Sequence, residues 1–228
     1  MSLVDTSSLG ATLDAVNEAL FFGRRVTKAD RVEAAKWLVS RQGLPRSYAG
    51  MFAPTDRDYA EGVRVFTGER IASGAATGHI LGEEALRALL LLGVDTAAVR
   101  AAVARARVGM ETRVGDAEAR GYRTGMYCCG TCSCAYWRNL TVGGLSHAER
   151  RLKAGMEEMK ARRLGTGKWR TFPFHYAVLA LTEIDLPGAM AELRYAAPVL
   201  ERYLKQPAKD DLHHLRRRAV AERALARC

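Results

Sequence analysis

Hydrophobic positions recur with a helical period along the whole chain. In residues 8–22, for example, Leu9, Leu13, Val16 and Leu20 fall on one stripe of a helix. Long stretches in which hydrophobic and polar residues alternate with a period of two are absent, so a large sheet is not expected. The same pattern predicts further helices over residues 59–65, 80–92, 96–107, 128–140, 172–184, 188–204 and 210–227. The fold class predicted from the pattern is all-α.

Start and stop signals divide the chain into these helices. Thr27 with Asp30, and Ser146 with Glu149, have the spacing of a capping box, which predicts that one helix begins at each pair. Residues 109–125 are polar and glycine-containing, and they predict a long connection between two helices.

Two kinds of helix alternate along the sequence. Residues 80–92, 128–140 and 172–184 are largely apolar, which predicts buried helices, whereas their neighbours are amphipathic. Ala85, Ala135 and Ala177 occupy equivalent places in the three apolar segments, 50 and 42 residues apart, which is the range of two-helix repeats. We therefore expect one domain over residues 1–228, built from repeated helical hairpins.

Two architectures satisfy this repeat. One is a partial α/α toroid, whose inner helices surround a central cavity, and the other is an open, HEAT-like α solenoid. The toroid is favoured because residues 122–134 and 166–174 place aromatic and polar residues just before or at the start of two apolar helices. Such segments would deliver side chains to a shared cavity.

Composition and charge narrow the choice of partners. The 228 residues are 48% hydrophobic and 26% charged, as in ordinary globular proteins. The net charge of +10 favours anionic partners such as nucleic acid or phosphate esters, although scattered arginines are also typical of a solvated helix face. The longest apolar run, residues 89–92, is too short to span a membrane, and the N-terminus lacks a signal-peptide pattern. A cytoplasmic protein with reduced cysteines is expected.

The cysteines suggest a metal site. Cys128, Cys129, Cys132 and Cys134 lie within seven positions, and the spacing of Cys129 and Cys132 lets two thiolates bind one zinc or iron ion. A second cysteine pair is absent, so histidines would have to complete the site. The alternative is that these small residues pack the interior of a crowded helix.

Two segments resemble a known family. Cys132–Trp137 is similar to a helix start in the β subunits of protein prenyltransferases, and Phe174–Tyr176 resembles the helix start that supplies their zinc-bound histidine. Residues 167–184 also resemble repeats of the wider squalene-cyclase group. The resemblance implies an α/α toroid that binds an apolar or isoprenoid-like ligand. It also implies zinc held by Cys134 and His175, with Cys132 at the family's aspartate position. The Asp-rich motif of the cyclases is absent, so whether the chain is an enzyme stays open.

Other residues are candidates for ligand binding. Lys168, Trp169 and Arg170 follow two glycines at a predicted helix start, where cations and free N–H groups could bind a phosphate, unless Trp169 simply fills the core of a tight turn. His79 and Glu83 would face the same cavity mouth if the repeats stack, although acidic residues near a helix start also stabilise its dipole.

The second apolar helix adds Trp137 and Arg138 to this candidate set. A different function would suit the solenoid alternative: a non-enzymatic, basic protein that binds nucleic acid or a protein partner, with the basic residues 209–227 contributing. An interaction module without chemistry is a third possibility.

Overall fold

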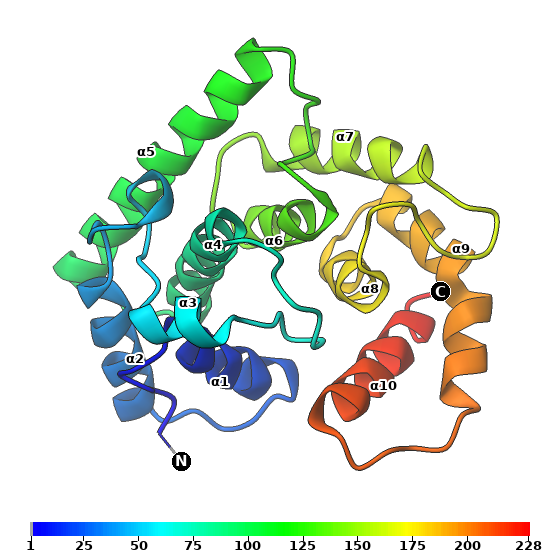
Figure 1. The fold of residues 1–228 in the computed structure, drawn as a ribbon, viewed down its shortest axis with the longest axis horizontal. Coiled ribbons are helices and arrows are strands. Elements are labelled where there is room, and N and C mark those ends of the chain that lie inside the picture. The colour runs from blue at the N-terminus through cyan, green and yellow to red at the C-terminus, as the bar shows by residue number, and fades with distance from the viewer. Residues whose placement is uncertain (1) are drawn as a thin grey trace. The chain divides into compact units, whose positions relative to one another are not determined.

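The computed structural model describes residues 2–228 and confirms the all-α prediction. Within that range the regular elements are helices, joined by loops that contain three isolated bridges. The helices, labelled in Figure 1, are α1 (Leu9–Phe21), α2 (Lys28–Ser40), η1 (Tyr48–Gly50), α3 (Asp56–Glu61), α4 (Gly74–Leu92), α5 (Ala97–Ala119), α6 (Gly130–Thr141), α7 (Ala148–Lys160), α8 (Phe174–Glu183), α9 (Pro187–Leu204) and α10 (Leu212–Leu225). None of these helices combines the length and the hydrophobicity needed to cross a membrane.

The helices group into two compact units. The first holds the described residues up to 65, residues 70–121 and residues 142–146, and so contains α1 to α5. The second holds residues 66–69, 122–141 and 147–228, and so contains α6 to α10. A single domain of repeated hairpins closing into a partial toroid goes beyond this grouping and stays a prediction.

Helix α4 forms the core of the first unit. It contacts α1, α2, α3 and α5, and every residue from Thr77 to Leu89 is buried. The helix predicted over residues 80–92 is therefore a buried helix, as expected. It begins earlier than predicted, because the Ser73 side chain accepts a hydrogen bond from the Ala76 N–H and caps the helix.

Helix α8 plays the same part in the second unit. It contacts α6, α9 and α10, while α7 packs on α6 and α9. All residues from Cys132 to Leu140 in α6, and from Tyr176 to Thr182 in α8, are buried. The other two predicted buried helices are thereby confirmed.

Two local predictions were wrong. The polar connection over residues 109–125 is largely helical, because Met110 and Val114 continue the buried stripe of α5, and the helix ends only at Ala119. The capping box at Ser146 does not form: the N-cap of α7 is His147, which makes no side-chain cap, and the Ser146 N–H donates to a Glu111 carboxylate oxygen instead. The capping box of Thr27 and Asp30 is confirmed.

Candidate metal centre

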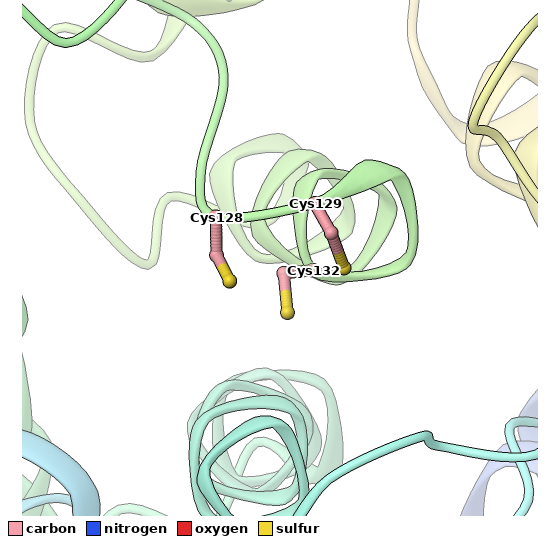
Figure 2. A group of neighbouring side chains, drawn as sticks. All are labelled: Cys128, Cys129 and Cys132. Atoms are coloured by element: carbon pink, nitrogen blue, oxygen red, sulfur yellow. The ribbon is translucent and has the colours of Figure 1, made fainter.

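Three thiols meet at the start of α6. Cys128 and Cys129 immediately precede the helix and Cys132 lies in its first turn, and the three side chains extend from one side of the helix start (Figure 2). Their sulfur atoms all lie within 4.8 Å of one another. Cys128 and Cys129 are exposed, whereas Cys132 is buried. Among residues 2–228, no other group of three or more histidines, cysteines or acidic residues has this geometry.

The local backbone explains why the thiols converge. Residues three apart in a helical turn lie on the same face, which brings Cys129 beside Cys132. Cys128 has a φ of 51°, in the left-handed region, and this turn adds its side chain to the pair. Ser133 secures the loop, because its hydroxyl oxygen accepts from the Tyr127 N–H at 3.0 Å and lies 2.8 Å from the Cys129 carbonyl oxygen, to which it donates.

Two glycines let this segment pack closely on its surroundings. A Cβ atom at Gly130 would lie 2.1 Å from the Thr171 carbonyl oxygen, just before α8. A Cβ atom at Gly125, whose φ is +83°, would lie 2.3 Å from the Gly155 nitrogen of α7. The backbone on either side of the thiols therefore packs closely against α7 and against the segment before α8.

Hydrogen bonds make the thiols unequal. The pKa of Cys129 falls to about 5, mainly because the Cys132 thiol donates a hydrogen bond to its sulfur and secondly because the Cys132 and Thr131 N–H groups donate as well. The same hydrogen bond, together with burial, raises the pKa of Cys132 far above its usual value. At neutral pH the cluster therefore holds a thiolate at Cys129 beside a thiol at Cys132.

These residues fit a zinc ion. Thiolates prefer zinc and other soft metals, and tetrahedral zinc with Zn–S bonds of about 2.3 Å places its sulfur ligands about 3.8 Å apart. Sulfur atoms within 4.8 Å need only small side-chain rotations to reach that spacing, and two of the three are on exposed residues that can rotate. A bound cation would also drive the remaining thiols to lose their protons.

The predicted ligand set of Cys132, Cys134 and His175 is not brought together. Cys132 joins the cluster, but residues two apart on a helix point in different directions, and Cys134 is completely buried. Burial, followed by the charge of Glu69, raises the pKa of the Cys134 thiol well above its usual value. His175 packs instead between aromatic rings, with its centroid 4.8 Å from that of Tyr203.

Three residues predicted to bind a ligand are core residues of the second unit. The Trp137 Nε1–H donates to the Gly125 carbonyl oxygen at 2.6 Å, and the Trp169 Nε1–H donates to a Glu192 carboxylate at 2.7 Å. The buried Arg138 pairs with Glu183, with Nε and Oε2 at 2.9 Å. The alternative that Trp169 fills the core therefore describes its position, and only Lys168 and Arg170 of that segment are exposed.

The remaining candidates lie in the first unit. His79 Nε2 is 3.0 Å from a Glu83 carboxylate oxygen, one turn further along α4, and both side chains are buried. The Tyr48 ring meets the His79 ring edge-on at 5.2 Å. A cavity mouth shared with Arg138 and His175 would combine residues of both units, and it stays a prediction.

Comparison with protein-family models, curated proteins and solved structures finds no match for this chain. The sequence pattern singled out the cysteine segment, but the predicted ligand set did not include Cys128 and Cys129. The contiguous Cys-Cys-x-x-Cys motif could have indicated them.

Proposed function

We propose that the protein binds one zinc ion through Cys128, Cys129 and Cys132, and that this ion acts on a fourth, exchangeable ligand. The observation that carries the proposal is the convergence of three thiol sulfurs within 4.8 Å at the start of α6. Three protein ligands are typical of zinc sites that keep an open coordination position, whereas structural sites usually have four.

The environment of the thiols supports a zinc ion that is reactive at its open coordination position. Zinc bound by the three thiols would lower the pKa of a water molecule or an exogenous thiol in that position and so generate a nucleophile near neutral pH. Cys128 and Cys129 are exposed, so small molecules can approach from solvent, while the buried Cys132 fixes the third ligand. Cys129 is already a thiolate at neutral pH, which favours the first step of metal capture.

The substrate is a separate proposal. The resemblance to prenyltransferases predicts an apolar or isoprenoid-like ligand in a toroid cavity, and the open zinc position would then activate a thiol or a water molecule. The alternative, a basic HEAT-like protein that binds nucleic acid or a protein partner without catalysis, predicts affinity that falls steeply with salt. Both stay predictions, since no relative of known function bears on them.

Elemental analysis tests the zinc proposal. Protein purified without chelators is expected to contain about one zinc per chain, and Cys132→Ala is expected to abolish it by removing one of three ligands. Cys134→Ala is the matched control, because it removes a buried thiol from the same helix outside the cluster. It is expected to retain the metal.

Two results would contradict the proposal. Wild-type protein without zinc, even after reconstitution under reducing conditions, would exclude the site. Loss of zinc in Cys134→Ala and His175→Ala, with retention in Cys132→Ala, would restore the ligand pair implied by the resemblance.

A further inference from the structure

We propose that a pocket at the start of α8 binds an organic phosphate whose organic part is a planar aromatic group. The pocket belongs to the second unit and does not depend on the zinc site. Its volume of about 520 Å³ suits a small molecule. The lining includes Lys168, Phe174, His175, Val199, Arg202 and Tyr203.

Charge is the first reason for this ligand class. Lys168 and Arg202 both line the pocket, and none of its lining residues is acidic. Within residues 2–228, neither the Lys168 ammonium nor the Arg202 guanidinium has a hydrogen bond or an ion pair. Two cations without a neutralising carboxylate favour an anion that can accept several charge-assisted hydrogen bonds, as a phosphate does.

Aromatic rings supply the second reason. The Lys168 Nζ lies 5.5 Å from the centroid of the Phe174 ring, so the positive charge stands directly beside an aromatic surface. Trp169 stacks on Phe174 from within the core, with centroids 6.0 Å apart, and holds that ring in place. A planar group that enters between the Lys168 ammonium and the Phe174 ring would stack on Phe174 and leave its phosphate within reach of the flexible Lys168 side chain.

His175 adds a polar group between the rings. Burial first, then the charges of Arg217 and Lys168, lower the pKa of His175 to about 4, so the ring is neutral at pH 7. Its Nδ1 atom is buried and has no hydrogen-bond partner among the described residues. A neutral imidazole with a free nitrogen can donate to, or accept from, a polar group of a ligand without repelling it.

The test uses 1-naphthyl phosphate, with inorganic phosphate and 1-naphthol as its two halves, in calorimetric titrations of the full chain. Naphthyl phosphate is expected to bind once per chain and more tightly than either half. The double variant K168Q/R202Q should weaken its binding by about tenfold or more, because two charge-assisted contacts are lost, and leave 1-naphthol unchanged. Phe174→Leu should weaken naphthyl phosphate but leave inorganic phosphate unchanged.

The matched control is K28Q/K36Q, which removes the same charge from exposed positions of α2, in the first unit and outside the pocket. It should leave all affinities within about twofold, since distant exposed charges are screened. Equal weakening by both double variants would reduce the effect to net charge and overturn the proposal, as would an affinity for naphthyl phosphate no higher than for inorganic phosphate. Binding is also expected to persist in Cys132→Ala, so a failure of the zinc proposal would leave this result unaffected.

Discussion

Helices α6 and α8 are both buried along most of their length, yet their first turns create opposite chemical environments. The start of α6 presents exposed cysteines, one of which is stabilised as an anion by hydrogen bonds from its neighbours. The start of α8 presents a histidine that burial and nearby cations keep neutral. The resemblance predicted that the two starts would share one zinc ion, whereas the thiols that lie together all belong to the start of α6: Cys128, Cys129 and Cys132.

The difference shows how the surroundings of a helix start determine its chemistry. At α6 the donors are the Cys132 thiol and the N–H groups of the first turn, which favour negative charge at Cys129. At α8 a carboxylate oxygen of Glu69 accepts from the Tyr176 N–H at 3.3 Å, while Lys168 and Arg217 oppose a positive charge on His175. The start of α6 therefore stabilises a negative charge on Cys129, whereas the start of α8 disfavours a positive charge on His175.

Replacing His175 should give the largest effect. Its pKa is about 4 in the folded chain against 6.5 for an unperturbed histidine, so between these values the unfolded chain binds the extra proton. His175 therefore lowers the stability as pH falls from 6.5 to 4, by up to about 3 kcal/mol, and its own contribution does not change further below that window. His175→Phe should remove this part of the pH dependence, measured by urea unfolding at pH 7 and pH 4.5. An unchanged pH dependence would show that the imidazole is not held neutral.

Gly130→Ala should give an intermediate effect at the other helix start. The added Cβ would meet the Thr171 carbonyl oxygen, so backbone must move, which costs about 2 kcal/mol and separates the thiols. Zinc content should fall together with the unfolding free energy. Gly115→Ala in α5 is the control, because its Cβ meets nothing within 4 Å, and it should stabilise the helix slightly. Similar behaviour of the two variants would contradict the close packing at α6.

The smallest expected effect is a difference in alkylation rate between Cys129 and Cys228. At pH 6 the metal-free protein should react with iodoacetamide about tenfold faster at Cys129 than at Cys228, because the larger thiolate fraction outweighs the lower nucleophilicity of a weakly basic thiolate. Cys228 is a suitable reference, since it is also exposed, and partial desolvation of its thiol raises its pKa. Peptide mapping gives both rates, and equal rates would mean that Cys129 is an ordinary thiol.

Much of the fold could be predicted because it depends on local patterns. The stripe of α1 and the capping box at Thr27 use neighbouring residues: the capping box forms, and Leu9, Leu13 and Val16 of the stripe are buried, although Leu20 is only partly so. The errors arose where distant contacts decide: Met110 and Val114 extend α5 by packing, and Glu111 takes the Ser146 N–H that a capping box would have used.

The sequence predicted the residue type that forms the candidate site, but not which cysteines lie together in it. Contiguous cysteines indicated a metal, yet the choice between Cys128 and Cys134 depends on a left-handed φ at Cys128 and on the direction of a side chain two residues along a helix. His175 was assigned to zinc from the resemblance alone. Its actual neighbours, Tyr203 and Arg217, come from helices much later in the chain, and no local pattern reveals them.

The close approaches of Gly125 and Gly130 have a consequence for biosynthesis. The segment that carries the thiols rests against Gly155 and Thr171, which leave the ribosome later than the cysteines do. A nascent chain that has exposed only the cysteine motif lacks α7 and the segment before α8, against which the loop packs. Metal loading should therefore follow translation of α7 and the segment before α8, and a short synthetic peptide copy of the motif should bind zinc more weakly than the whole protein.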